Sequence, residues 1–270
     1  MIQERTIARQ AYTSPEITNV LQEISGNSDL ATLFWVGSAL EFAFHKDVDW
    51  LFFGKGILKD PFLRVILSAQ YFKKFAFGSP EQQQRTASQI RHFHTPLEHK
   101  RGYDIPDEAY RDVLMMIIEM GERAYEQIHG PMNYEQRLEY FEACQKMGRW
   151  MEIPDLPQNY DEYLQMREES LHHNYHSSKY AEKLFQSYRS HFGPVRYYLI
   201  KQIMALLSPA SLKPFHCFRC GWFFSLAFKL YRRVRNRYAI TLLEILLIPK
   251  RYRRQAHAIN VWASRPMNSL

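Results

Sequence analysis

Helix N-cap signals recur along most of this chain, and each one is followed by an apolar run with helical spacing. Asp60-Pro61, Ser79-Pro80 and Asn133 each place a capping side chain directly before such a run. The oxygen of a capping side chain accepts a hydrogen bond from a backbone N–H that the helix leaves unsatisfied at its start, and proline fits the first helical position. Sustained period-two alternation is rare, and the hairpin dipeptides Asn-Gly and Asp-Gly are absent. The sequence therefore predicts an all-α fold.

Further helices are expected to begin near Ser14, after Asp104, after Asn159 and at Pro194, and two more apolar runs cover residues 222–230 and 240–247. We expect the helix that begins at Ser79 to end at His94, because Pro96 disfavours helical geometry at the residue before it. No linker rich in Gly, Ser or Pro divides the chain. Residues 1–270 are therefore predicted to form a single multi-helix domain, with a basic helical part at 211–270.

Composition excludes several classes of protein. Hydrophobic residues make up 46% and aromatic residues 15% of the chain, which is too much for a disordered protein. Three cysteines cannot form a disulfide framework. The N-terminal residues lack the pattern of a signal peptide, and no apolar stretch reaches the roughly 18 residues that cross a bilayer. These features predict a cytoplasmic protein.

Charge is distributed unevenly along the chain. Residues 191–270 contain 14 Lys and Arg but one acid, Glu244, whereas the first 190 residues contain 21 bases and 27 acids. Such a basic third could meet nucleic acid, an anionic membrane surface, acidic ligand groups or the acidic part of the same chain. We do not expect a nucleic-acid partner. The runs 222–230 and 240–247 alternate with arginines, so peripheral membrane contact and internal packing stay open.

Two patterns suggest metal binding, each with a simpler alternative. Cys217-x-x-Cys220 has no second pair to complete a structural zinc site, so we interpret these cysteines as core or incidental. Glu126-x-x-His129 and Glu169-x-x-His172 place carboxylate and imidazole on one helix face, as di-iron bundles do. Supporting carboxylates would be Glu41 and Glu142. The alternative is that these pairs are solvated helix ends, since His129 precedes Gly130-Pro131.

His94 is a candidate ligand to haem iron. At the end of a rigid helix, a free terminal carbonyl could orient its imidazole, as an axial ligand requires. On spacing alone, a histidine that interacts with the helix dipole is the simpler interpretation. His92 lies about 200° away around the helix, so the two histidines cannot face the same pocket.

Several segments resemble the MpaB and rubber-oxygenase (latex-clearing protein) family. The similar stretches lie at 60–68, 77–79, 90–97, 103–108, 113–114, 137–148, 153–157 and 191–197. Their order and spacing carry the resemblance, which covers roughly residues 40–210.

The resemblance implies an all-helical b-type haem oxygenase whose domain encloses a haem pocket. Its substrates would be dioxygen and an unsaturated hydrophobic small molecule, isoprenoid-like or lipid-like. His94 falls at the family's proximal iron ligand, Arg64 at its distal arginine and Ser68 at a threonine of the family. Tyr71 and Arg91 are expected to contact the cofactor. Leu67 stands where rubber oxygenases have a lysine, so a lysine-capped iron is not expected.

The residues themselves support part of this implication. Arg64, Ser68 and Tyr71 are spaced i, i+4 and i+7 and so share a helix face. A guanidinium on that face could stabilise negative charge that develops on dioxygen, or it could pair with a haem propionate, Asp47 or Asp49. Two other functions stay open: a di-iron oxidase built on the two Glu-x-x-His pairs, and a non-enzymatic helical binding module that uses the basic C-terminal face.

Overall fold

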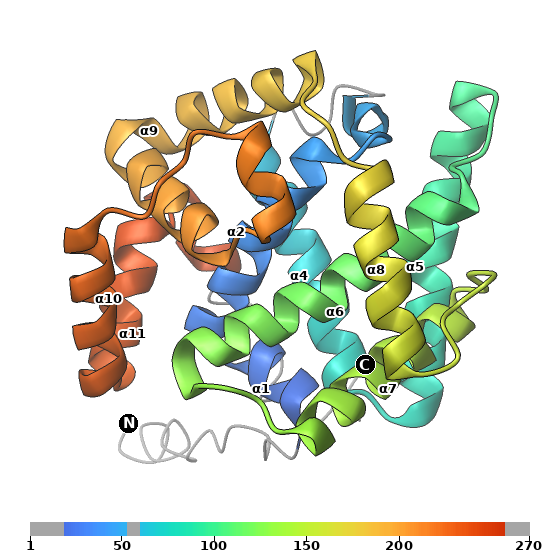
Figure 1. The fold of residues 1–270 in the computed structure, drawn as a ribbon, viewed down its shortest axis with the longest axis horizontal. Helices are drawn as coiled ribbons and strands as arrows, with labels where there is room; N and C mark the ends of the chain where they lie inside the picture. The colour runs from blue at the N-terminus through green and yellow to red at the C-terminus, as the bar shows by residue number, and fades with distance from the viewer. Residues whose placement is uncertain (1–18, 53–59, 257–270) are drawn as a thin grey trace, which may run out of the picture.

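The structure is a computed structural model that describes residues 19–52 and 60–256 (Figure 1). It confirms the all-α prediction for this part of the chain, where the nearest approach to a strand is an isolated bridge between His45 and Tyr175. The elements are α1 (Val20–Gly26), α2 (Ser28–Phe44), η2 (Val48–Phe52), α4 (Pro61–Phe77), α5 (Pro80–Arg101), α6 (Asp107–His129), α7 (Tyr134–Trp150), α8 (Tyr160–His173), α9 (Lys179–Leu207), η3 (Ala210–Phe215), α10 (Trp222–Val234), α11 (Arg237–Leu247) and η4 (Lys250–Tyr252).

The capping side chains act as predicted. The carboxylate of Asp60 accepts a hydrogen bond from the backbone N–H of Leu63 at 3.0 Å. Ser79 and Gln82 form a reciprocal capping box at the start of α5, and Asn133 forms one at the start of α7. Ser14 lies outside the described residues, and the first described helix instead begins after Asn19. Local side-chain chemistry therefore determines where these helices begin.

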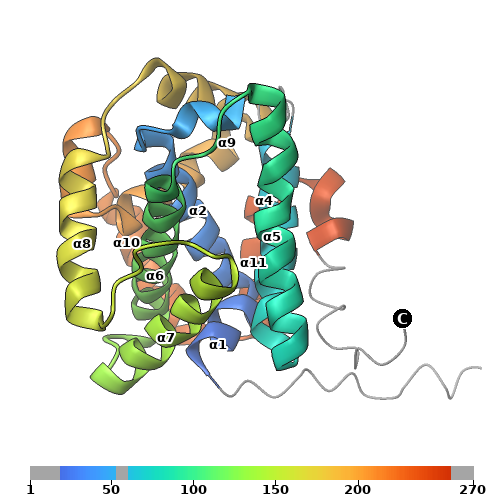
Figure 2. The same cartoon turned by 90° about the vertical axis from the view of Figure 1, so that its right-hand side faces the viewer.

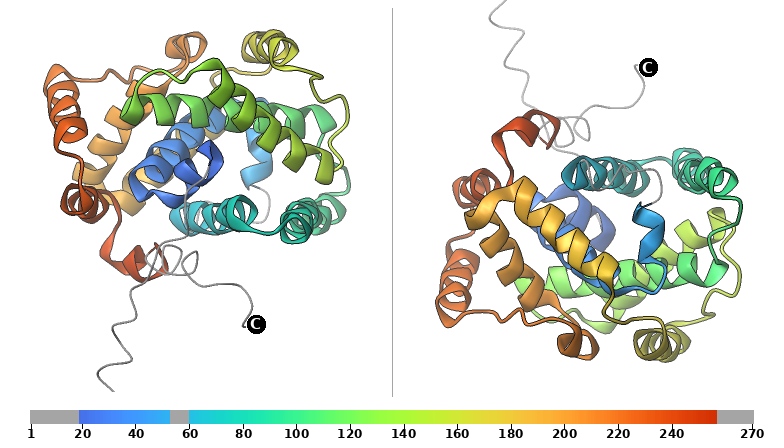
Figure 3. Two further views of the ribbon diagram at one scale, coloured as in Figure 1. Left: turned by 90° about the horizontal axis from the view of Figure 1, so that it is seen from below. Right: turned by 90° about the horizontal axis from the view of Figure 1, so that it is seen from above.

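Helix α2 lies at the centre of the molecule, and α1, α6 and α9 pack around it (Figure 3). Its buried side chains cover more than half of its circumference, and Trp35, Val36 and Ala39 on the remaining face are half-buried. The buried apolar residues are Leu30, Leu33, Phe34, Leu40, Ala43 and Phe44. A helix that is apolar all round is stable only when it is enclosed. The other helices therefore form a shell around α2.

Helix α9 bends where the sequence predicts a new helix. Gly193 has a φ of +74°, a left-handed value that glycine adopts without a steric penalty. Pro194 follows and opens the second segment, in agreement with the prediction. In the described part of the chain, no helix is both long and apolar enough to cross a bilayer.

A buried ionic cluster joins α2 to α6 and α8. Arg167 is nearly inaccessible and forms ion pairs with the fully buried Glu41 and with Glu119, the latter at 2.8 Å between Nε and Oε2. The Tyr175 hydroxyl donates a further hydrogen bond to Glu41 at 3.0 Å. Burial of a charge is tolerated only with such partners, so Arg167 makes the position of Glu41 in the core possible.

We predict that Arg167→Met lowers the free energy of unfolding by about 3–5 kcal/mol, because it leaves Glu41 buried without a counter-charge. Arg123→Met is the matched control, since Arg123 also pairs with Glu119 but its side chain is 35% exposed; it should cost less than about 1 kcal/mol. Urea denaturation of both variants measures the difference. Equal losses of unfolding free energy in the two variants would show that the buried ion pair stabilises the fold no more than the exposed one.

Candidate functional site

Helix α5 carries His94 and continues past it to Arg101, so the prediction that it ends at His94 is wrong. Pro96 lies inside the helix and removes one hydrogen bond, because it has no N–H for the carbonyl of His92. The side chain of Glu98 stabilises the helical turn after Pro96. Its Oε1 accepts hydrogen bonds from the Ile105 N–H and the Tyr110 hydroxyl, both at 3.1 Å. The helix ends at Gly102, whose φ of +83° terminates it.

The imidazole of His94 is fixed by its own helix. Its Nδ1 lies 3.0 Å from the carbonyl oxygen of Ile90, one turn earlier, rather than from a free terminal carbonyl as the sequence had suggested. Its ring packs edge-on against Tyr110 of α6, with 5.3 Å between centroids. With Nδ1–H donating to Ile90, the lone pair of Nε2 is the one left to bind a metal.

His94 is held in the neutral form. Burial lowers the pKa of His94 below 6.5, and the positive charge of Arg64 lowers it further. When the pKa of a histidine is lowered, the ring stays unprotonated as the pH falls through the usual histidine pKa. His94 therefore keeps its lone pair at pH 6.5. Neutral imidazole is the form that binds iron. The charge effect also places Arg64 within electrostatic reach of His94.

Arg64 lies in the first turns of α4, which packs against α5 (Figure 2). Its side chain is exposed, yet the surrounding protein lowers its pKa. That combination is typical of a residue that lines an indentation. The alternatives in which it pairs with Asp47 or Asp49 are wrong. Asp49 pairs with Arg101 at 2.5 Å, and Asp47 lies 3.8 Å from His45.

Ser68 and Tyr71 follow Arg64 along α4. Ser68 is half-buried. The Tyr71 ring packs against Phe93 of α5, with 5.1 Å between centroids, and the Lys74 ammonium lies 5.1 Å above it. Tyr71 therefore contributes to the α4–α5 interface, and its predicted contact with a cofactor stays a prediction.

Arg91 lies one turn before His94 and faces the same aromatic ring. Its guanidinium is 4.3 Å from the centroid of Tyr110, and its Nη1 is buried without a hydrogen-bond partner among the described residues. A buried cationic donor without an acceptor is costly, and a carboxylate would satisfy it. The sequence analysis missed Tyr110 and Glu98 as members of this cluster. The available signal was the position of Glu98 one turn after His94.

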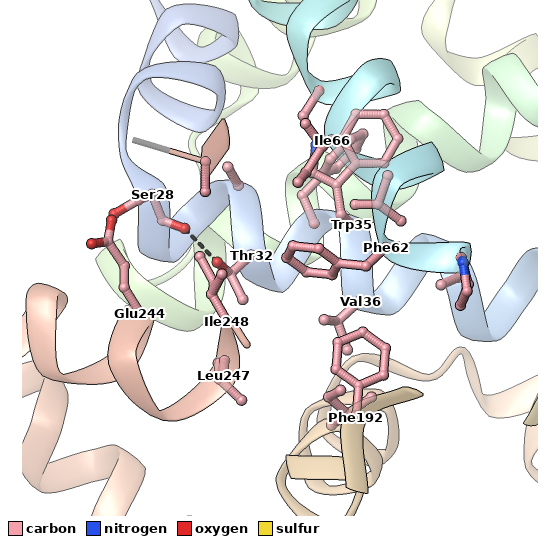
Figure 4. A pocket seen from close by; sticks show the side chains of 18 of the residues that line it. Ser28, Thr32, Trp35, Val36, Phe62, Ile66, Phe192, Glu244, Leu247 and Ile248 are labelled. Atoms are coloured by element: carbon pink, nitrogen blue, oxygen red, sulfur yellow. Dashed lines mark hydrogen bonds between the residues drawn. The ribbon is translucent and has the colours of Figure 1, made fainter. Parts of the chain in front are cut away.

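A cavity of about 370 Å³ lies between α1, α2, α4, α9 and α11 (Figure 4). Its wall is mainly apolar, with Trp35, Phe62, Ile66 and Phe192 around one part of it. Polar groups gather at the other part, where Ser28, Thr32 and Glu244 lie (Figure 4). A cavity of this size and polarity fits an apolar ligand.

This cavity and the His94 cluster lie on opposite sides of α4. Phe62, Val65, Ile66, Ala69 and Phe72 of α4 line the cavity. At 100° per residue, Arg64, Ser68 and Tyr71 point the other way, and neither Arg64 nor His94 contributes to the cavity wall. Helix α4 therefore separates an apolar space from the polar cluster.

The structure contradicts the di-iron alternative. Glu126 pairs with Arg137, and His129 lies 3.3 Å from Glu23. Glu169, His172 and Glu142 are exposed, whereas Glu41 is buried with Arg167. Across residues 19–52 and 60–256, no three His, Cys, Asp or Glu side chains are placed to hold a metal ion. Chance spacing produced the two Glu-x-x-His pairs.

The Cys217-x-x-Cys220 pair is not part of the core. Cys217 is exposed and Cys220 half-buried, whereas the third cysteine, Cys144, is buried. The neighbouring His216 hydrogen-bonds through Nε2 with the Ser208 hydroxyl at 2.9 Å. The interpretation of Cys217 and Cys220 as incidental therefore fits, and the core interpretation is wrong.

Fold and site together define an all-α protein with one oriented, neutral histidine beside two arginines. Residues 48–263 match the family model described as ER-bound oxygenase mpaB/B′/rubber oxygenase, catalytic domain, and the chain therefore belongs to this family. Comparison with curated proteins and with solved structures gives no match. Family membership indicates an oxidoreductase of the oxygenase type. The match extends beyond the predicted end of the resemblance and includes α10 and α11.

We predict that Pro96→Ala stabilises the protein by about 2 kcal/mol, because it restores the hydrogen bond to His92 and removes a steric clash inside α5. This net gain already allows for the greater conformational entropy of the unfolded chain without proline, which costs up to about 1 kcal/mol. Pro106→Ala is the control, since Pro106 precedes α6 and has a compatible φ of −56°. Thermal unfolding followed by circular dichroism tests both. A destabilised Pro96→Ala variant would mean that α5 ends before Pro96.

Proposed function

We propose that this protein is a haem-dependent oxygenase that uses dioxygen to oxidise an unsaturated hydrophobic small molecule, isoprenoid-like or lipid-like. The observation that carries the proposal is the orientation of His94, whose Nδ1 is tied to Ile90 and whose imidazole is kept neutral. Family membership supports the oxygenase class.

The residues around His94 would supply two contacts to a haem. Nε2 of His94 would ligate the iron, and the buried Nη1 of Arg91, which has no acceptor in the described part, would gain one in a propionate carboxylate. Tyr110 would support both groups through its ring, because it packs against His94 and lies below Arg91. When bound, haem b supplies a redox-active iron that reacts with dioxygen.

Arg64 is the candidate for charge stabilisation. Arginine is protonated at any physiological pH. Among the described residues, Arg64 forms no ion pair with Asp47 or Asp49. A preorganised guanidinium lowers the energy of a transition state in which oxygen gains negative charge. Ser68 would add a weaker, neutral donor one turn later.

The apolar cavity supports the class of substrate. Its volume suits an aliphatic chain of moderate length, and apolar side chains such as Trp35 and Phe62 make up most of its wall (Figure 4). In the first turn of α4, Phe62 lines the cavity while Arg64 faces the His94 cluster. A chain-like substrate that passes this turn would reach both.

We predict that His94→Ala abolishes tight haem binding and keeps the helical circular-dichroism signal. The controls are His92→Ala and His99→Ala, because both side chains are exposed on the same helix. Titration of the purified apoprotein with haemin, read at the Soret band, measures the affinity. Unchanged affinity in His94→Ala would assign the iron to another residue.

We predict that Arg64→Leu retains haem but lowers turnover per bound haem by about 10²–10³-fold, since a preorganised donor to developing charge is worth that much. Ser68→Ala should lose less. Arg91→Leu should show the reverse pattern, with faster haem dissociation and nearly normal turnover per haem. Arg85→Leu, an exposed arginine on α5, is the control.

Oxygen uptake with squalene or farnesol as substrate, together with haem transfer to apomyoglobin, separates the two roles. Faster haem loss from Arg64→Leu with normal turnover per haem would make Arg64 a propionate ligand and remove its role toward oxygen.

A further inference from the structure

Helix α10 presents an apolar surface that the rest of the protein leaves uncovered. None of its residues is buried, and Trp222 and Phe223 are 78% and 70% exposed. Leu226, Leu230 and Val234 continue the same exposed stripe toward the end of the helix. Five apolar side chains of α10 thus face away from the core, which is unusual for a packed helix.

Helix α11 extends this surface. Tyr238 is 76% exposed, and Leu242, Ile245 and Leu246 are exposed on the same side of the helix. Figures 1 and 3 show α10 and α11 together along one side of the molecule. We call these residues the α10–α11 face: Trp222, Phe223, Leu226, Leu230, Val234, Tyr238, Leu242, Ile245 and Leu246.

The two helices are firmly attached, so the exposed surface is not a product of loose packing. Arg235 forms two hydrogen bonds with the carboxylate of Asp29 in α2, at 2.7 and 3.1 Å. The Tyr231 hydroxyl donates to the same carboxylate at 2.6 Å. Phe224 and Phe228 pack against the core on the inner side of α10. The outer side therefore has a fixed orientation.

Positive charge surrounds the α10–α11 face. In the described C-terminal third, Arg235 is the one base that forms an ion pair with an acid. The exposed bases near the face are Lys229, Arg232, Arg233, Arg237, Lys250, Arg251 and Arg254. Apart from Arg235, pairing of the basic third with the acidic part of the chain, one of the alternatives that the sequence leaves open, is therefore not seen in these described residues.

The face also borders the apolar cavity. Ile245 is exposed and at the same time contributes to the cavity wall, together with Thr241, Glu244 and Ile248 of the same helix end. An apolar molecule that leaves a lipid layer at α11 would thus have an adjacent space to enter.

We propose that the α10–α11 face docks onto an anionic lipid surface as a peripheral membrane contact. Exposed Trp and Tyr side chains favour the interfacial zone of a bilayer. Amphipathic helices with flanking bases bind membranes through apolar burial and through attraction to anionic headgroups. The proposal does not depend on the haem chemistry, although it would bring a hydrophobic substrate close to the cavity.

Charge argues against two other occupants of the α10–α11 face, a second copy of the chain and the chain's own terminal segments. A symmetric dimer through this face would place the same seven bases of two copies opposite each other. Residues 1–18 contain two acids and two bases, and residues 257–270 contain one base and no acid. Neither segment carries the negative charge that complements the face, whereas an anionic bilayer does.

The test is co-sedimentation of the full chain with vesicles of phosphatidylcholine alone or with 30% phosphatidylserine. We expect binding to the anionic vesicles that falls in 0.5 M NaCl. Arg232→Gln with Arg233→Gln should weaken binding about 25-fold, at about five-fold per base. Trp222→Ser with Phe223→Ser should weaken it at least as much.

Matched controls lie away from the face. Lys183→Gln with Arg189→Gln removes two exposed bases of α9, and Val195→Ser removes an exposed apolar side chain. Both control variants should bind as the unchanged protein does. Equal binding to neutral and anionic vesicles, or equal loss in face and control variants, would overturn the proposal. So would a concentration-dependent dimer that Trp222→Ser with Phe223→Ser dissociates, because it would assign the face to a second copy.

Discussion

Enclosure of α2 is the constraint on which the rest of the structure depends. Its side chains are apolar around the full circumference, with the exception of Asp29, Glu41 and a few small polar residues. Exposure of any side of this helix would leave large apolar groups in water, at a free-energy cost of about 25 cal/mol for each Å² of apolar surface. The helices around it therefore have to close a complete shell. Because Glu41 lies within that shell, Arg167 from α8 has to reach the centre as well.

The same property explains why the sequence analysis found the outer helices and overlooked α2. Outer helices such as α4 and α5 have a polar side, so their apolar positions recur with helical period after Asp60 and Ser79. Helix α2 has no polar side, and Asn27 before it makes no side-chain capping bond. A pattern that depends on the contrast between two faces cannot detect a helix that is apolar on all of them.

The site could be predicted where it depends on residues close in sequence and not where it depends on packing. Helical spacing placed Arg64, Ser68 and Tyr71 on one face of α4, and that face meets α5. The predicted end of α5 was wrong. Glu98 accepts hydrogen bonds from Ile105 and Tyr110 across the following loop, and these contacts outweigh the local effect of Pro96 on the helix. The cavity was not predictable, since its wall combines α1 and α2 with α4, α9 and α11, which follow much later in the sequence.

Helix α4 links the two halves of the proposed chemistry because its two faces have opposite character. Ile66 and Ala69 line an apolar cavity, while Arg64 contributes positive charge at His94. Side chains on opposite sides of a helix share few contacts, so their energetic effects should be nearly additive. A change of shape on the cavity side can then alter which hydrophobic molecule fits without altering the pKa of His94. This separation would let a single helical scaffold keep one cofactor site while its ligand cavity varies.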